Sequence, residues 1–503
     1  MFIAYDLKNG VEYGKAITST RDGKQVNKTY INLGRVIDKD KHIFKNRAHG
    51  IFVFNPEDGS FSTPDSSVIL PAVKRPPVKE KLILDFGDSY FLNQFIQNDG
   101  IKPAIDAAGC SNLDTLYTMV HYYILCRQAN CHAEDWWEGN YASILYPKAE
   151  LESQRISDLL AEIGDEENLR RFFKVYVKYV SKSAGDFSHI LIDSTELPNS
   201  VHFPLTAISN HNGDINNEMR LICVTQQETG LPIYFRYVAG NIVDVSTLVT
   251  TIAELKECGI NTKFAIMDAG YYGEDNIRTL YEHKVSFISR LKENFRLYKD
   301  LTAKYLPSIE KEANLVEYNG RYAYIKRVQC KLVDDHAGYA YICLDIERKG
   351  FETQKLFKRA KVQKLDKDEV FQKMSKEGAF VLVSSKRIAI DKILPTYYTR
   401  QQIEQLFDIG KNYADTLPIR VQTEETLRGH LLLTFIASVI VKRIQDKLKT
   451  TSNNPISMFM NLRNQKCKVY DDQVIAQEAS KKANDCYKCF NIKYDVEIPR
   501  KCG

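Results

Sequence analysis

The stretch HILIDST, from His189 to Thr195, is a run of aliphatic residues that reaches an acid at Asp193. A short apolar run of this kind predicts a buried strand. A second run, KFAIMDAGYYG (Lys263 to Gly273), reaches Asp268 beside a small residue and a glycine. Both carboxylates are therefore predicted at the ends of buried strands, although a single acid in such a place is often only a cap or a turn residue.

The segments around these two acids predict a mixed sheet. MRLICVTQ and LPIYFRYVAG are strand-like and are joined through Glu228-Thr229-Gly230, which predicts a hairpin. A helix is expected from about Val245 to Cys258, before the second acid. After Asp268 we expect a helix, the strand VSFISR, and later the buried strand GAFVLVSS (Gly378 to Ser385).

A later stretch, YYTRQQIEQLFDIGK (Tyr397 to Lys411), gathers charged side chains at helical spacing. On one helix that advances about 100° per residue, Arg400, Glu404 and Lys411 fall within about 40° of one another, and Tyr397 lies about 60° away. The ordinary explanation is a surface pair of Arg400 and Glu404, one turn apart. The alternative is that the face is functional.

Two aspartates on strands and a glutamate on a helix are what phosphoryl transfer with divalent ions requires. Mg²⁺ takes few protein carboxylates and keeps its other positions for water and phosphate oxygens. A pair of such ions can hold both the attacking and the leaving oxygen. The acids Glu196, Asp391 and Asp408 are alternatives for the third ligand.

The pattern Tyr397-x2-Arg400-x3-Glu404-x6-Lys411 resembles the Tyr-Arg-Glu-Lys signature of a large group of bacterial insertion-sequence DDE transposases. LIDST is similar to that family's first-Asp block, with Ser194 as a departure at the middle position. IMDAGYY resembles the second-Asp block. GLPIYFRYVAGNIVDVSTL, FISRLKENFRLY and LRGHLLLTFIA are similar to further stretches of the same group.

This resemblance implies a ribonuclease H-like core with Asp193, Asp268 and Glu404 as catalytic metal ligands. It implies two Mg²⁺ ions, for which Mn²⁺ substitutes, and it assigns Tyr397, Arg400 and Lys411 to DNA binding. The family's reaction is cleavage at the inverted-repeat ends of the element and joining of the 3′-OH ends to target DNA. The implied partners are double-stranded DNA and a second copy of the chain in a homodimer.

The expected fold class is α+β and multidomain, with a ribonuclease H-like mixed-sheet core interrupted by a β-rich insertion, a small β-rich N-terminal module, and a helical region before the core. The expected domains are a β-rich module over residues 1–80, a helical region over 81–185, the first part of the core over 186–300, the insertion over 301–377, the second part of the core over 378–450, and a C-terminal tail over 451–503. The β-rich module is the candidate for binding DNA ends. The C-terminal tail is the candidate for dimerisation.

The composition fits a multidomain soluble protein of the cytoplasm, associated with the nucleoid. The chain has 503 residues, of which 44% are hydrophobic, and a net charge of +5. Its cations cluster in Lys355 to Lys367 and in Lys442 to Lys449, which suggests a polyanionic partner more than the net charge does, although either run alone is more often a solvated face. No signal peptide is apparent, and the longest apolar stretch, His430 to Ile444, is too short to span a bilayer and predicts a buried helix.

Eleven cysteines are scattered without a repeating framework, as in a reducing compartment. Only Cys486-x-x-Cys489 has metal-ligand spacing, with Cys467 and Cys502 on either side. A structural zinc site usually shows two close pairs, so free thiols are favoured over zinc.

Three other functions remain as alternatives. A metal-dependent nuclease, such as a Holliday-junction enzyme, would share the acids but has no reason to carry the Tyr-Arg-Glu-Lys face. A DNA-binding protein derived from a transposase would be expected to have lost an acid, and all three positions are occupied. A helical scaffold protein leaves the placement of Asp193 and Asp268 unexplained.

Overall fold

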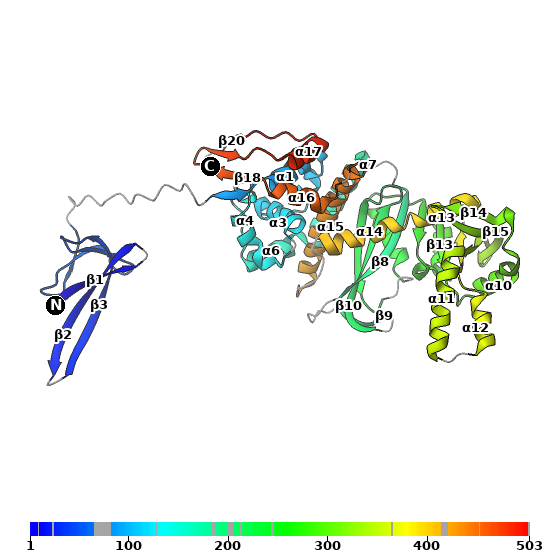
Figure 1. Cartoon of the computed structure of the whole chain (residues 1–503), viewed down its shortest axis with the longest axis horizontal. Coiled ribbons are helices and arrows are strands. Elements are labelled where there is room, and N and C mark those ends of the chain that lie inside the picture. The colour runs from blue at the N-terminus through cyan, green and yellow to red at the C-terminus, as the bar shows by residue number, and fades with distance from the viewer. Residues whose placement is uncertain are drawn as a thin grey trace. The chain divides into compact units, whose positions relative to one another are not determined.

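The chain divides into two compact units, Met1–Lys81 and Leu82–Gly503. The computed structural model (Figure 1) describes residues 1–8, 10–22, 25–64, 82–126, 128–183, 187–198, 205–211, 214–242, 246–363, 366–413, 421–451 and 453–500. The stretch Pro71 to Lys81, which reads as a linker from its prolines, lies outside these residues.

The first unit is a six-stranded antiparallel sheet whose strands pair in chain order. Its strands are β1 (Phe2–Lys8), β2 (Val11–Asp22), β3 (Gln25–Asp38), β4 (Ile43–Asn46), β5 (Gly50–Phe54) and β6 (Phe61–Ser62). The small core consists of Ala16, Leu33, Phe44, Phe52 and Phe54. Since apolar residues fill one face only, the unit depends on a few large aromatic side chains.

The second unit begins with a helical region that precedes the central sheet. Its α-helices are α1 (Gly87–Asp99), α2 (Lys102–Asp106), α3 (Leu113–Leu125), α4 (Ala133–Glu138), α5 (Ala142–Leu145), α6 (Ser153–Ile163) and α7 (Glu166–Ser183). Helix α3 is buried over most of its length, in keeping with the mostly apolar sequence LDTLYTMVHYYIL.

A ten-stranded mixed sheet forms the centre of the second unit. Its first part consists of β8 (His189–Pro198), β9 (Ala207–His211), β10 (Asp214–Gln226), β11 (Pro232–Ala239), β12 (Phe264–Met267) and β13 (Ser286–Leu291), with α8 (Leu248–Glu257) and α9 (Glu274–Glu282) between the later strands. The order is β11-β10-β8-β12-β13, antiparallel through β10 and parallel from β8 to β12 and β13. This is the ribonuclease H-like arrangement, and the predicted fold class is confirmed.

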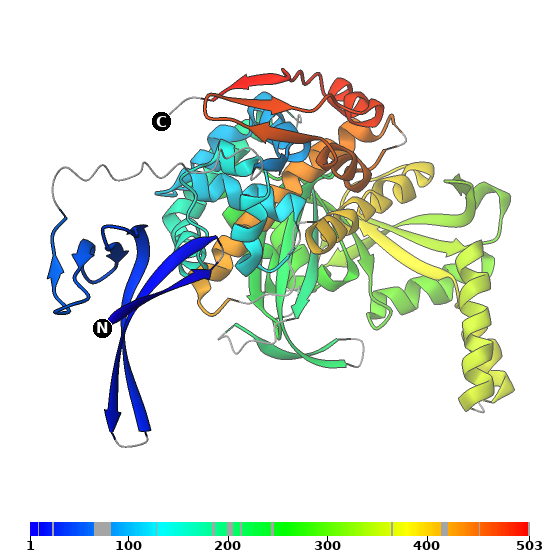
Figure 2. The same cartoon turned by 60° about the vertical axis from the view of Figure 1, so that its left-hand side comes forward.

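The segment inserted between β13 and the later helices extends the same sheet. Its elements are α10 (Arg296–Tyr305), β14 (Leu315–Tyr318), β15 (Arg321–Val333), β16 (His336–Asp345), α11 (Ile346–Gln363) and α12 (Lys367–Met374), followed by β17 (Ala379–Ser384). Strand β17 pairs with both β13 and β16, so the inserted hairpins continue the central sheet. The part from 346 to 374 is helical, and α11 and α12 project from the sheet (Figures 1 and 2).

The C-terminal segment folds back onto the start of the second unit. It contains α16 (Pro455–Arg463), β18 (Lys466–Val469), β19 (Gln473–Ala476), α17 (Lys481–Cys489) and β20 (Glu497–Pro499). These strands form a four-stranded sheet in the order β20-β19-β18-β7, where β7 is Ile83–Asp85. The segment thus completes a sheet that begins directly after the linker.

The cysteines of this segment are free thiols where the structure describes them. Cys467 and Cys486 are buried and Cys489 is partly buried, whereas Cys502 lies outside the described residues. Burial raises the pKa of the Cys486 thiol to about 11, which disfavours the thiolate that a metal would need.

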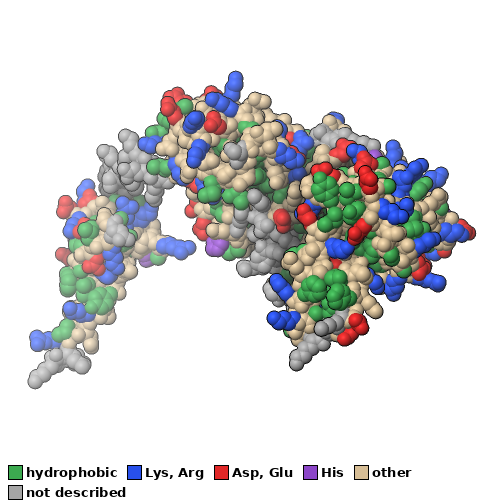
Figure 3. All heavy atoms as spheres, turned by 45° about the vertical axis from the view of Figure 1, so that its right-hand side comes forward, with side chains coloured by type: hydrophobic (Ala, Val, Ile, Leu, Met, Phe, Trp, Pro, Cys, Tyr) green, Lys and Arg blue, Asp and Glu red, His purple; other side chains and the backbone are tan. Residues whose placement is uncertain are grey.

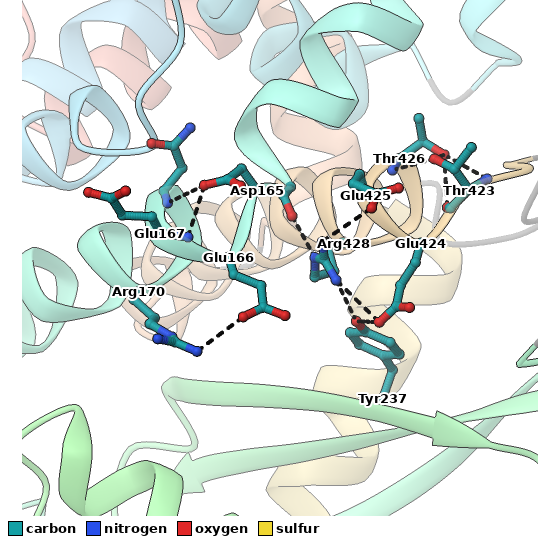
Figure 4. Close-up of polar contacts among 12 residues, drawn as sticks. Asp165, Glu166, Glu167, Arg170, Tyr237, Thr423, Glu424, Glu425, Thr426 and Arg428 are labelled. Atoms are coloured by element: carbon teal, nitrogen blue, oxygen red, sulfur yellow. Dashed lines mark hydrogen bonds and ion pairs between the residues drawn. The ribbon is translucent and has the colours of Figure 1, made fainter.

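Helix α15 (Glu424–Leu448) joins the helical region to the sheet. Its Arg428 donates from Nε to the carbonyl oxygen of Gly164 at 2.5 Å, and its Nη1 lies 3.4 Å from the hydroxyl of Tyr237 on β11 and 3.2 Å from Glu424 (Figure 4). One buried guanidinium therefore connects the end of α6, the sheet and its own helix.

The sequence from His430 to Ile444 lies inside α15 and is buried almost throughout, as predicted. The cationic run from Lys442 to Lys449 overlaps the end of this stretch, and its first two cations are paired with acids and not free to bind a polyanion. Lys442 is buried and pairs with Asp446 at 3.1 Å, and Arg443 pairs with Asp99 at 2.7 Å. No helix in the described part of the chain is both long and apolar enough to cross a membrane.

The contact between α6 and α15 predicts that Gly429→Ala destabilises the second unit. A methyl group at Gly429 would collide with the backbone oxygen of Leu160, and forcing such a contact costs on the order of 1–3 kcal/mol. Urea unfolding should show a lower midpoint than for wild type.

The matched control is Gly350→Ala, in the interior of α11, where the added methyl group meets nothing within 4 Å. That change should stabilise the helix by about 0.5–1 kcal/mol. Equal midpoints for the two variants would contradict the close helix packing.

Candidate active site

The register of two parallel strands brings Asp193 and Asp268 together. Strand β12 pairs with β8 so that Phe264 lies opposite His189 and Met267 opposite Ile192. The next residue of each strand is an aspartate, and the two therefore lie side by side where the pairing ends. Strand β8 itself continues to Pro198, so Asp193 marks the end of the parallel pairing and not, as expected, the end of its strand.

The stretch from Tyr397 to Lys411 forms two helices and not the single helix that the sequence predicted. Helix α13 (Ile390–Tyr398) ends, and α14 (Gln401–Tyr413) begins after a short tightened turn. In this turn the amide of Arg400 donates to the carbonyl of Tyr397 at 3.1 Å, and the amide of Ile403 donates to the carbonyl of Arg400 at 3.0 Å. Both hydrogen bonds run from the amide of residue i+3 to the carbonyl of residue i, as in a 3₁₀-helix, and such bonds tighten the backbone relative to an α-helix.

The guanidinium of Arg400 contacts all three predicted carboxylates. Its Nη1 donates to Asp193, and its Nη2 lies 3.0 Å from Glu404 and 3.9 Å from Asp268. The hydroxyl of Tyr397 donates to Asp268 at 3.4 Å. The structure thus brings together three of the four signature side chains, Tyr397, Arg400 and Glu404, with both aspartates.

The contact of Arg400 with these acids is more than a surface ion pair. The side chain of Arg400 is 19% exposed and that of Asp193 is 12% exposed, whereas Asp268 and Glu404 are 41% and 53% exposed. Burial opposes the charge of Arg400, but the neighbouring charges of Asp193 and Asp268 outweigh it, and the pKa of the guanidinium is raised. One side of the cluster is closed and the other faces solvent.

The phenol of Tyr397 is kept protonated in this cluster. Burial, with a contribution from the charge of Asp268, raises its pKa well above the ordinary value for a tyrosine. A buried phenol that stays protonated can donate to an anion at neutral pH.

The remaining candidates are placed as follows. Lys411 belongs to α14, but its side chain lies outside the described residues. Asp391 lies in the first turn of α13, 4.0 Å from Lys392, and Asp408 lies one turn after Glu404. Glu196 lies three positions after Asp193 on β8, and side chains three positions apart in a strand point to opposite faces.

Lys292 is a further cation beside the site that the sequence did not single out. It directly follows β13, and its Nζ lies 3.5 Å from the carbonyl oxygen of Gly270, two residues after Asp268. Lys292 belongs to the stretch FISRLKENFRLY, which resembles the transposase family. That resemblance could have identified Lys292 as a site residue, whereas composition and residue spacing could not.

The first turn of α14 is positioned by the hairpin between β10 and β11. Gly230 in that hairpin has a φ of +67°, and a methyl group there would lie 2.6 Å from Oε1 of Gln402. Nε2 of Gln402 in turn donates to the carbonyl of Glu228 at 3.3 Å. The hairpin therefore supports the helix that carries Glu404.

The donor set fits a hard divalent ion, because all three side chains are carboxylates. Among the described residues, no three acidic, histidine or cysteine side chains lie close enough together to hold a metal ion. The three carboxylates of the site are spread around the guanidinium of Arg400. The acids are thus held by a cation that an incoming ion would have to replace.

The fold and these carboxylates define a ribonuclease H-like protein with an acidic candidate active site. The transposase DDE domain family matches residues 184–440, just over half of the 503 residues, and the chain belongs to that family. It is a DNA transposase, an enzyme whose class cleaves DNA with divalent metal ions.

Among solved structures, the chain is similar to a chain of a piggyBac transposase synaptic complex with hairpin DNA, determined by cryo-EM. The two are 12% identical, with a TM-score of 0.39, and the likeness covers 75% of this chain and 79% of that one. No curated protein matches the sequence.

The support of α14 by the hairpin predicts that Gly230→Ala lowers stability. The change adds backbone strain at a positive φ and a collision with Gln402, each worth on the order of 1–3 kcal/mol. We expect a lower melting temperature than for Gly100→Ala, measured by differential scanning calorimetry.

Gly100 is the matched control because it has a φ of +82° and no atom within 4 Å of an added methyl group. It isolates the backbone strain from the contact. If both variants melt at the same temperature, the hairpin does not support α14.

Proposed function

We propose that this chain is the transposase of a bacterial insertion sequence of the Tyr-Arg-Glu-Lys group. It binds the inverted-repeat ends of the element, cleaves them with two divalent metal ions, and joins the 3′-OH ends to target DNA. The observation that carries the proposal is the convergence of Asp193, Asp268 and Glu404, from two strands and a later helix, on the guanidinium of Arg400.

In this proposal Asp193, Asp268 and Glu404 are the catalytic metal ligands. The ions are Mg²⁺, with Mn²⁺ able to substitute. Bound there, they would activate water or a 3′-OH and stabilise charge on the phosphate oxygens. Because cleavage and joining are both displacements at a phosphate, one set of carboxylates serves both reactions.

Tyr397, Arg400 and Lys411 are the proposed DNA-binding residues of the site. A buried guanidinium next to a solvent-facing side of the cluster can exchange a carboxylate for a DNA phosphate, which is the anion it binds best through paired N–H groups. Such an exchange would release the carboxylates of Asp193 and Glu404 when DNA arrives. Metal binding would then be stronger in the presence of DNA than in its absence.

The proposed partners are double-stranded DNA, both as element ends and as target, and a second copy of the chain. Two ends must be cut together, and a homodimer supplies one site for each. The N-terminal sheet is the proposed module for end binding, and the C-terminal segment is the proposed region of dimer contact. Such a protein would work at the nucleoid.

The test is cleavage of a plasmid that carries the gene's own flanking DNA, by purified protein with Mg²⁺. We expect paired cuts at inverted ends by wild type, and none by Asp268→Asn or Glu404→Gln. Loss of a metal-ligating carboxylate should reduce the rate by at least about a thousandfold, a barrier increase of roughly 4 kcal/mol. A sequencing gel reads out the positions.

The matched controls are Asp391→Asn on α13 and Asp408→Asn on α14. These changes remove acids from the helices that carry Tyr397 and Glu404 and do not change Arg400. Both should cut as wild type does. Scattered cutting that persists in Asp268→Asn would indicate a nuclease with a different active site. Binding to the ends without any cutting would indicate a DNA-binding protein that is derived from a transposase and does not cleave DNA.

The cluster also predicts that Arg400→Gln raises the affinity of the DNA-free protein for Mn²⁺. Removing a positive charge within 4 Å of three carboxylates leaves them more attractive to a cation, on the order of tenfold in dissociation constant. Isothermal titration calorimetry without DNA measures this directly, and binding to end DNA should weaken in the same variant.

Arg278→Gln is the control, because Arg278 on α9 pairs with Asp275 at 2.6 Å and Asp334 at 2.9 Å, neither of which is one of the three acids. It should change Mn²⁺ affinity little. If Arg400→Gln leaves Mn²⁺ affinity unchanged or weaker, Arg400 does not compete with the ion.

A further inference from the structure

Helix α11 leaves the sheet and exposes most of its surface. It contacts β15 and β16 near its start and α12 beyond them, and Leu356 is its only buried residue in the described part of the chain. Figures 1 and 2 show α11, in yellow-green, projecting from the sheet with α12 beside it. A helix with so little buried surface contributes little to the core.

The outer face of α11 carries a stripe in which two lysines lie between two apolar side chains. At about 100° per residue, Phe351, Lys355, Lys358 and Val362 fall within about 60° of one another, and Leu356 lies roughly 100–160° away. Phe351 is 58% exposed and Val362 is 83% exposed. The ammonium of Lys355 lies 4.5 Å from the centroid of the Phe351 ring. The stripe is about 16 Å long.

Most charges of this half of α11 are not balanced by neighbouring acids, although Arg359 acts on Glu377, where burial raises the pKa of the carboxyl and the charge of Arg359 opposes that rise. From Thr353 to Gln363 the helix holds four cations, Lys355, Lys358, Arg359 and Lys361, and no acid. None of the four makes an ion pair with a carboxylate in the described residues. The two acids nearer the start of the helix are already bound, Glu347 by Arg321 at 3.2 Å and Glu352 by Arg348 at 2.7 Å.

Cations near the end of a helix also have a simpler explanation, because they interact favourably with the helix dipole. That explanation covers Lys358 to Lys361 but not the exposed aromatic and aliphatic side chains between them. Phe357 is 47% exposed, and Phe371 on α12 is 60% exposed. Figure 3 shows Lys and Arg side chains gathered, with exposed hydrophobic ones, on the part of the molecule where the inserted segment lies.

We propose that this stripe, formed by Phe351, Lys355, Lys358 and Val362, binds the backbone of duplex DNA. Phosphates along one strand rise about 3.4 Å per nucleotide, close to the rise of roughly 4.5 Å between Lys355 and Lys358. The apolar side chains pack against sugars. In this proposal the lysines contact phosphates and not base edges, so the contact is independent of sequence.

DNA is the partner because the chain is a DNA transposase and because the stripe's charge is complementary to it. The inserted hairpins share one continuous sheet with Asp193 and Asp268. A duplex held at the acidic site can therefore be contacted a second time by the same rigid body. The proposal rests on the family assignment and not on the roles of the three acids.

The test is the salt dependence of binding to a short duplex of random sequence, measured by fluorescence anisotropy in EDTA with the full chain. Lys355→Glu with Lys358→Glu should lower the slope of log affinity against log salt by about 1.8, or roughly 0.9 for each lost phosphate contact. Phe351→Ala should weaken binding without changing the slope. Because no metal is present, failure of the acidic site cannot affect the result.

The matched control is Lys481→Glu with Lys482→Glu on α17, two exposed lysines whose replacement changes the net charge equally. That variant should keep the wild-type slope. Equal losses in both double variants would overturn the proposal and assign the effect to net charge. A wild-type slope in the α11 variant would also overturn it, and a loss of dimer in sedimentation would then assign the stripe to a second copy of the chain.

Discussion

The parallel pairing of β8 with β12 is the constraint on which the rest of the active site depends. Three successive pairs of buried apolar residues, preceded by the pair of Phe264 with the half-buried His189, fix the register, and the residue after each run is an aspartate. A slip of one residue would turn every side chain of the strand to the other face. The apolar core therefore sets the distance between two charged groups that contribute nothing to it.

Two like charges held side by side are unstable unless something compensates them. In this chain the compensation is Arg400, which reaches both aspartates and also Glu404. The tightened turn at Arg400 separates α13 from α14, and the same cluster joins Tyr397, which contacts Asp268, with Glu404, which contacts Arg400. The same carboxylates that hold Arg400 are the proposed ligands for metal ions, so the cation and the ions would compete for one set of oxygens.

The sequence was a good guide to the strands and a poorer one to the later helices. The runs Ile190 to Ile192 and Phe264–Met267 are short, apolar and buried in the sheet, so a local pattern is enough to predict them. The stretch from Tyr397 to Lys411 has the sequence pattern of one helix. In the structure, a turn with hydrogen bonds of the 3₁₀ type divides this stretch between two helices. The cationic runs were equally ambiguous, because Lys442 and Arg443 are matched by Asp446 and Asp99, and Lys355 and Lys358 are not. Asp446 is one helical turn from Lys442, but Asp99 is far from Arg443 in the chain, and only the tertiary structure reveals that pairing.

The sequence by itself determined the mixed sheet, the two aspartates that follow its apolar runs, and the resemblance that joined them to Glu404. These are local properties, set by side-chain period and by residue spacing. The tertiary structure alone decided which side chains meet: that Arg400 contacts three acids, that Gly230 supports α14 through Gln402, and that Lys355 and Lys358 on the projecting α11 form no ion pair within the described residues. The physical reason is that an ionic or steric contact depends on distance in space, and residues about 200 positions apart in the chain carry no local sign of their proximity.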